Sequence, residues 1–370
     1  MKKLNRAQKT FALLTLLFVS SLLIYQNCSV KGFKVKTSGS EAELGSNISV
    51  QYSPTQLTSA LISAANLLVF RLPTSDELEY ASKSKENYQK VIESYVNDQR
   101  FADAMFEEHR NYLELGGTSA DSSNDIDYNL PARMGAYIVY NDRDYREVLS
   151  ADYCVNSNYQ TQSTCGDTFQ DGGTASQNAA GVISTRSFIA AHKKNKGFNF
   201  VLVARSAKKF LCTAYPDPQD PGLAPSQISN VHKPWSDDAA CFNCHRTLNP
   251  RAVLFFNYND QGRYTADINS TTIRDTTDPA KISDLVTTGL PVTVLGRPAS
   301  TLRDYGAAIT DDPRFTNCMV LRYVNYMTGY NYETLPSNLT YLSDTFARSG
   351  FSVKQLLEEI ATTPQFVSKR

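Results

Sequence analysis

The chain has 370 residues, of which 41% are hydrophobic and 20% are charged, so it can bury a substantial core and is not intrinsically disordered. Its 37 basic residues equal its 37 acidic residues, and no basic cluster stands out. This balance excludes the strongly basic class of nucleic-acid-binding proteins. Length alone predicts two or three modules.

Residues 1–27 predict an export signal. The uncharged run FALLTLLFVSSLLIY at 11–25 is too short for a membrane span of about 20 residues and suits the apolar part of a signal peptide. Cys28 follows closely, where a bacterial lipoprotein carries its lipid-acceptor cysteine. Residues 25–27 depart from the small residues usual before that cysteine. Basic side chains precede the run at Lys2, Lys3, Arg6 and Lys9.

We therefore expect a lipoprotein anchored at Cys28. An uncleaved membrane anchor and a plain secretory signal are the alternatives. Ser29, rather than Asp, after the cysteine favours the outer membrane, with the body facing the periplasm. Cleavage would remove four basic and no acidic side chains, which leaves an acidic mature chain. The other six cysteines would then meet an oxidising compartment, where disulfides persist.

Residues 28–53 are polar and predict a flexible linker, and residues 54–117 predict a helical module. Thr74 and Glu77 form a candidate capping box, and a later helix should run from near Arg100 to before Gly116. Glu107-Glu108-His109 on that helix predicts a solvated face. Apolar positions at helical spacing are Leu57, Leu61, Ile62, Ala65, Leu68, Tyr88, Val91, Ile92, Tyr95 and Val96.

The remaining chain predicts a loop-rich middle module at 118–212, a haem module at 213–300 and a helical module at 301–370. Short helices are expected at 144–152 and within 181–212, and short strands within 266–300. In the last module Asp312-Pro313 should begin a helix and Gly329 should end it, and Ser352 with Gln355 predicts a second capping box. The expected fold class is mainly α, with several helical modules, an embedded haem segment and long irregular loops.

The sequence Cys241-Phe242-Asn243-Cys244-His245 is a C-x-x-C-H motif. In this motif two thiols add to the vinyl groups of haem, and the histidine becomes the proximal iron ligand. A redox-active C-x-x-C would need a thioredoxin-like setting, and a zinc site would need further Cys or His ligands nearby. A plain disulfide with a chance histidine is the remaining alternative.

The sequence around the motif resembles the planctomycete-type cytochrome c family, a set of consecutive domains of unknown function. Its C-x-x-C-H is followed by positions matched here by Arg246, Pro250, Asn257, Asp260, Gly262, Arg263 and Tyr264. Asn249 stands where the family usually has Asp. Further segments resemble the family in order: DYREVLSADY at 144–153, GVISTRSFIAAH at 181–192, FLC at 210–212, FTNC at 315–318 with YMTG at 326–329, and the tail at 349–366.

The resemblance covers about residues 55–368 and implies a mostly helical haem c protein of the cell envelope. We expect an electron-transfer protein, rather than a defined enzyme, that works with an envelope redox partner protein and not with nucleic acid. Two alternatives stay open. One is a peroxidase-like haem oxidoreductase with an open axial site, and the other is a haem-free structural or binding lipoprotein.

The sequence leaves three possibilities for the distal ligand of the iron. His232 lies shortly before the motif, and Met327 lies downstream in the order familiar from small cytochromes c. An open position is the third possibility, and core packing is the commoner role for a methionine such as Met327.

The four cysteines left after lipid and haem attachment predict disulfides. Cys154 and Cys165 share a polar loop and predict a local bridge. The resemblance puts Cys212 and Cys318 at recurrent cysteine positions and implies a long-range bridge, with two buried thiols as the alternative. Paired acids at 237–238 and 311–312 predict helix caps rather than catalysis. No serine-hydrolase, nucleotide-loop or dinucleotide motif is found.

We expect Cys28→Ala to release the protein from membranes or to leave it unprocessed, because the acceptor thiol for the lipid is lost. Fractionation and mass measurement of the parent and the variant check this. A variant as membrane-bound and as normally sized as the parent would show that Cys28 is not lipidated.

Overall fold

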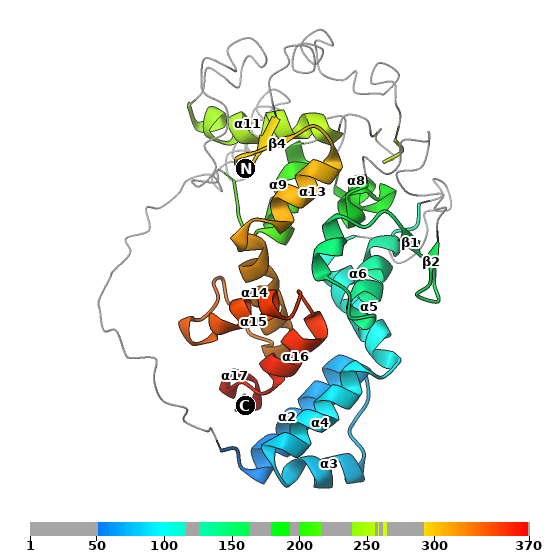
Figure 1. Ribbon diagram of the computed structural model, residues 1–370, viewed down its shortest axis with the longest axis vertical. Helices are drawn as coiled ribbons and strands as arrows, with labels where there is room; N and C mark the ends of the chain where they lie inside the picture. Colours follow the sequence, from blue (N-terminus) through cyan, green and yellow to red (C-terminus); the bar gives the residue numbers. More distant parts are fainter. Residues whose placement is uncertain are drawn as a thin grey trace, which may run out of the picture. The chain divides into compact units, whose positions relative to one another are not determined.

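The protein is described here from a computed structural model, whose described residues are 51–115, 126–162, 179–192, 200–215, 239–255, 258, 262–264 and 292–368. They contain thirteen α-helices and two small antiparallel sheets, so the fold is mainly helical, as predicted (Figure 1). The predicted signal segment, Cys28 and most of the predicted linker lie outside these residues.

Four helices form the N-terminal part of the fold: α2 (Pro54–Val69), α3 (Ser75–Ser82), α4 (Lys85–Val96) and α5 (Arg100–Leu113). The predicted capping box of Thr74 and Glu77 is present at α3, and Ser53 with Gln56 forms another at α2. The predicted apolar faces of α2 and α4 are buried, except that Ile62 is 43% exposed and its predicted burial is wrong.

The middle segment contains a helix that the sequence analysis did not predict, α6 (Leu130–Tyr140), packed against α5. Its sequence LPARMGAYIVY is apolar almost all round, so it has no polar face to reveal a helical period. The other middle elements are η2 (Tyr145–Leu149), β1 (Cys154–Val155), β2 (Thr161–Gln162), η3 (Gly181–Ser184), α8 (Arg186–His192) and α9 (Phe200–Phe210). The helices predicted within 144–152 and 181–212 are thus present.

The next elements are α11 (Ala239–Ala252), η4 (Val253–Phe255), β3 (Val292–Val294), β4 (Arg297–Ala299) and α13 (Leu302–Thr310). Strands β3 and β4 pair with Val292 opposite Ala299. The two loop residues between them, Leu295 and Gly296, both have positive φ, as tight hairpin turns require.

The C-terminal elements are α14 (Pro313–Thr328), η6 (Ser337–Leu339), α15 (Tyr341–Arg348), α16 (Val353–Ala361) and α17 (Pro364–Val367). The Asp312 side chain caps α14 with Pro313 at its start, and Gly329 ends it at φ 71°, both as predicted. Ser352 accepts from the backbone N–H of Gln355, which is one half of the predicted capping box.

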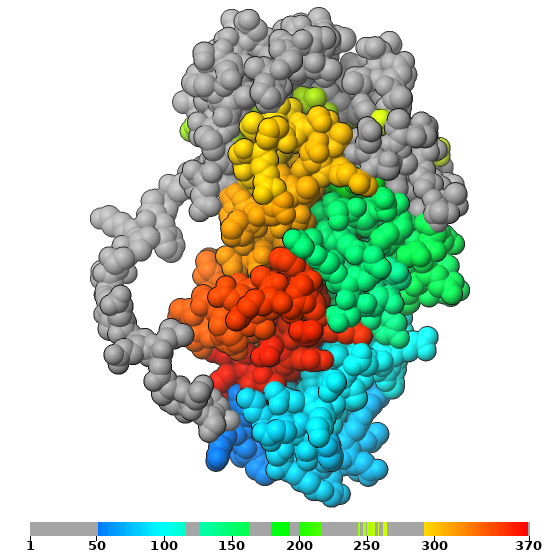
Figure 2. Space-filling model, viewed as in Figure 1, coloured from blue at the N-terminus to red at the C-terminus, as the bar shows by residue number. Residues whose placement is uncertain are grey.

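The C-terminal helices pack back onto the N-terminal ones (Figures 1 and 2). The Tyr88 hydroxyl donates to the carbonyl of Ala361 at 3.0 Å, and the Tyr52 hydroxyl donates to that of Thr362 at 2.8 Å. A single buried cluster of apolar side chains runs from Leu57 to Val367. The sequence ends of this unit, residues 50–370, therefore share one core.

Cys212, just after α9, and Cys318, in α14, form a disulfide with 5.3 Å between their α-carbons. These are the two cysteines paired with each other in the sequence analysis. Cys154 also takes part in a disulfide, but Cys165, its predicted partner, lies outside the described residues.

We expect the double substitution Cys212→Ala and Cys318→Ala to lower the free energy of unfolding by up to about 4–5 kcal/mol, because the bridge closes a long loop in the unfolded chain. Urea unfolding of the parent and the variant without reductant measures this. The difference should shrink when reductant is added to both. Equal stability without reductant would contradict the prediction.

Candidate functional site

The C-x-x-C-H motif lies within helix α11. Positions 241, 244 and 245 are related by three and four residues, so a helix brings them to one face. The Cys244 side chain is half-buried and Asn243 is exposed, while the side chains of Cys241 and His245 lie outside the described residues. The backbone thus presents two cysteine positions and one histidine position on the same side.

Helix α11 packs against α9 and β3. Leu248 and Ala252 are buried there. Arg251 is only 2% exposed, and its guanidinium donates to the carbonyl of Thr293 at 3.2 Å and to the hydroxyl of Tyr215 at 3.0 Å. These contacts orient the helix that carries the motif.

After α11, the backbone at Gly262 lies in direct contact with the backbone of Arg186 at the start of helix α8. Gly262 has φ +69°, and a Cβ at this position would lie 2.6 Å from the carbonyl oxygen of Arg186. Tyr258 and Tyr264 form a β-bridge around this glycine, with their rings edge to face. Only glycine fits here, which gives a physical reason for one of the positions that carry the resemblance.

Glycines in η3 and α13 also lie against the backbone of η2. A Cβ at Gly181 would lie 2.1 Å from the Val148 oxygen, and one at Gly306 would lie 2.2 Å from the Leu149 oxygen. The N–H of Gly181 donates to Ala151 at 3.1 Å. Elements η2, η3 and α13 therefore pack through their backbones.

Met327, one predicted distal ligand, is fully buried on the last turn of α14. The neighbouring Tyr326 hydroxyl donates to the carbonyl of Leu67 in α2 at 2.6 Å, so this end of α14 lies beside α2. Helix α11 contacts α9 and β3 and lies well apart from α2 (Figure 1). His232, the other candidate, lies outside the described residues, as do the acids at 237–238.

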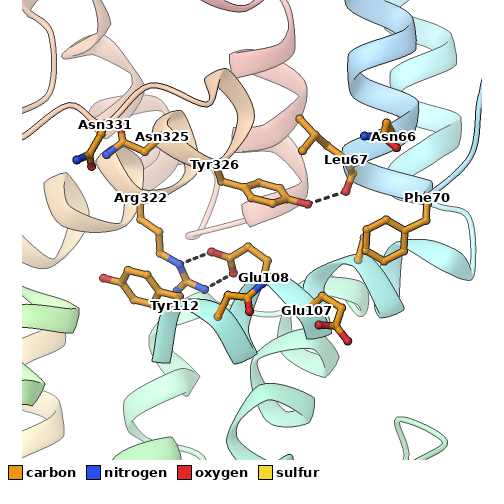
Figure 3. A pocket seen from close by; sticks show the side chains of 12 residues that line it. Asn66, Leu67, Phe70, Glu107, Glu108, Tyr112, Arg322, Asn325, Tyr326 and Asn331 are labelled. Atoms are coloured by element: carbon orange, nitrogen blue, oxygen red, sulfur yellow. Dashed lines mark hydrogen bonds and ion pairs between the residues drawn. The ribbon is translucent and has the colours of Figure 1, made fainter. Parts of the chain in front are cut away.

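A buried ion pair, absent from the sequence predictions, joins α5 to α14 (Figure 3). The Arg322 guanidinium donates from Nε to one oxygen of Glu108 at 2.7 Å and from a terminal nitrogen to the other. Glu108 is 7% exposed and Arg322 is 6% exposed. The guanidinium also stacks over the ring of Tyr112, with 3.8 Å from its central carbon to the ring centroid.

A hydrogen-bonded chain continues from this pair to a buried histidine. Arg322 donates to the Tyr145 hydroxyl at 2.5 Å, and that hydroxyl lies 2.9 Å from Nε2 of His109. Nδ1 of His109 lies 2.7 Å from the carbonyl of Met105, which can only accept, so Nδ1 carries the proton and Nε2 accepts from Tyr145. Burial, followed by the positive charge of Arg322, lowers the His109 pKa to about 4.

The prediction that Glu107-Glu108-His109 forms a solvated face is therefore wrong for Glu108 and His109. A signal for their burial was present. The buried stripe of α5 begins at Phe101, Ala104 and Met105, and positions 108 and 109 continue it at helical spacing.

No protein-family model, curated protein or solved structure matches the chain. Within the described residues, no group of three or more His, Cys, Asp or Glu side chains is arranged to hold a metal ion. None of the described helices combines the length and apolarity that a membrane span requires.

The buried histidines predict a loss of stability in mild acid. Burial lowers the pKa of both His109 and His192 to about 4, below the ordinary 6.5, so the unfolded chain binds protons first as the pH falls. The part of the stability that comes from these two histidines is fully present well above pH 6.5 and is lost as the pH falls toward 4. Each histidine should lower the free energy of unfolding at pH 5 by about 2 kcal/mol relative to its value at pH 7.5.

The contribution of His109 is measured as a difference between parent and His109→Gln, because Glu358 acts in the opposite direction. Burial raises the Glu358 pKa to about 6, which favours folding as the pH falls. Urea unfolding at pH 7.5 and 5 should show a smaller acid loss in the variant, by about 2 kcal/mol. The same loss in both proteins would mean that His109 is not held neutral.

Proposed function

We propose that the chain is a c-type haem lipoprotein of the cell envelope that passes single electrons to and from a redox partner protein. One observation carries the proposal: the C-x-x-C-H motif lies on helix α11, with positions 241, 244 and 245 on one face, in a chain predicted to be exported. The mutual contacts among segments that resemble the planctomycete-type cytochromes support it.

The residues fit a covalently bound haem by their chemistry. Cys241 and Cys244 would hold the porphyrin through thioether bonds, and His245 would be the proximal axial ligand. When bound, haem supplies an iron that accepts and releases one electron. The half-burial of Cys244 and the packing of α11 against α9 would keep one side of the group away from water, which tunes the potential.

A second candidate function follows from the position of Met327. Its burial beside α2 favours either His232 or an open distal position over methionine ligation. An open position admits small ligands, so a peroxidase-like oxidoreductase is the alternative. The spectrum of the ferric protein with and without cyanide separates the two, because only an open iron takes up the ligand readily.

The decisive test is expression of the full chain with a c-type haem maturation system. Thioether-bound haem survives denaturation, so the mature band on a denaturing gel should stain for haem peroxidase activity. The double variant Cys241→Ala and Cys244→Ala should lose the stain completely, and His245→Ala should change or abolish the absorption spectrum. Asn243→Ala is the matched control, since Asn243 is exposed between the two cysteines.

Absence of haem in the parent, when a known c-type cytochrome matures normally in the same cells, would overturn the proposal. The protein would then be a haem-free structural or binding lipoprotein.

A further inference from the structure

A cavity of about 640 Å³ opens between α2, α5 and α14 (Figure 3). Its volume lies within the range of about 300–1,000 Å³ typical of small-molecule sites. It lies beside α2 and not beside α11, so it is separate from the proposed haem segment. Its lining includes Asn66, Phe70, Glu107, Asn111, Arg322 and Asn331.

The charges that line the cavity are balanced within the protein. Glu107 pairs with Arg110 at 2.6 Å, and Glu108 pairs with Arg322. A charged ligand would therefore have to compete with one of these ion pairs, whereas an uncharged ligand would leave both pairs intact. The charge pattern thus favours a neutral ligand.

Amide groups surround the opening. Asn66, Asn111 and Asn331 are exposed and line the cavity from two helices and a loop. Asn325 holds that loop, because its side-chain amide donates to the carbonyl of Tyr332 and accepts from its N–H, both at 3.0 Å. An amide both donates and accepts, which matches hydroxyl groups that also do both.

The guanidinium of Arg322 adds donors to the same wall. Within the described residues, its hydrogen bonds to Glu108 and Tyr145 use three of its five N–H groups. The hydroxyls of Tyr112 and Tyr326 are satisfied elsewhere, by the carbonyls of Lys209 and Leu67. These two tyrosines therefore offer apolar ring surface to the cavity.

Phe70 supplies an aromatic ring that the fold does not need. It ends α2 in the left-handed conformation, at φ 51°, where glycine is usual because a side chain is strained there. Phe351 has a similar φ, but its ring packs on Phe346 and under Arg146. Phe70 instead is 52% exposed and is one of the residues that line the cavity, so packing does not explain it.

We propose that this cavity binds an uncharged saccharide, with a sugar ring against Phe70 and its hydroxyls hydrogen-bonded to the amides and to Arg322. A sugar has apolar C–H faces and a rim of hydroxyls, which matches aromatic walls interleaved with amides. A flat apolar ligand such as a quinone would offer few hydrogen-bond partners to the amides of Asn66, Asn111 and Asn331 that surround the opening. The site is independent of the proposed haem.

The test uses the full mature chain and a panel of neutral disaccharides, cellobiose, maltose and chitobiose, with binding measured by ligand-observed NMR and calorimetry. At least one should bind, and its uronic-acid analogue should bind at least tenfold more weakly. Phe70→Gly should weaken binding by about tenfold or more, while Phe70→Tyr should retain it. The midpoint of thermal unfolding of Phe70→Gly should equal or exceed that of the parent, since the strain at φ 51° is removed.

Tyr80→Ala is the matched control, because Tyr80 is an exposed aromatic on α3 outside the cavity lining, and its binding should equal that of the parent. The proposal is overturned if no disaccharide binds, if the uronic-acid analogue binds equally well, or if Phe70→Gly binds like the parent. Repeating the titration on the Cys241→Ala, Cys244→Ala chain separates the outcome from that of the haem proposal, since saccharide binding should persist.

Discussion

The ion pair between Glu108 and Arg322 connects parts of the chain that are 214 residues apart. Both side chains are buried, so removing one partner would leave the other charge without its counter-charge, at a cost of about 3–5 kcal/mol. Tyr145 adds a third segment to the same guanidinium. Helix α5, η2 and α14 are thus held in one register by a single planar group, which has donors in a fixed fork. The opposite sides of this junction differ: one forms part of the cavity wall, and the other leads to His109.

The contact between His109 of α5 and Gly135 of α6 shows how closely these two helices approach each other. A Cβ at Gly135 of α6 would lie 2.1 Å from a ring carbon of His109. The imidazole therefore occupies the space that any other side chain at 135 would fill, and water has no access to it. A neutral histidine with both ring nitrogens hydrogen-bonded satisfies this environment, whereas a second positive charge next to Arg322 would not. The glycine of α6 and the low His109 pKa are two results of the same close contact.

The local sequence pattern is sufficient to predict a contact when the two residues that form it lie close together in the chain. The capping box of Thr74 and the start of α14 at Asp312 involve contacts within three residues, and both were predicted. Helix α6 was missed because an apolar surface on all sides has no period to detect. Glu108 was misassigned because its charge outweighed its position on the buried stripe of α5, and the compensating Arg322 could not be paired with it from sequence. The motif at 241–245 is conspicuous in sequence, and the structure adds its helical setting but not the side chains of Cys241 and His245.

The bond between Cys212 and Cys318 turns the intervening chain into a closed covalent ring, and all of α11 belongs to that ring. A protease that cuts once between residues 213 and 317 would open the ring without separating its two ends. The nicked molecule would keep its mass on a non-reducing gel and fall into two fragments only when the bond is reduced. Damage to the segment that carries the motif would thus leave the helical body, and whatever is attached to its N-terminus, joined to the C-terminal helices.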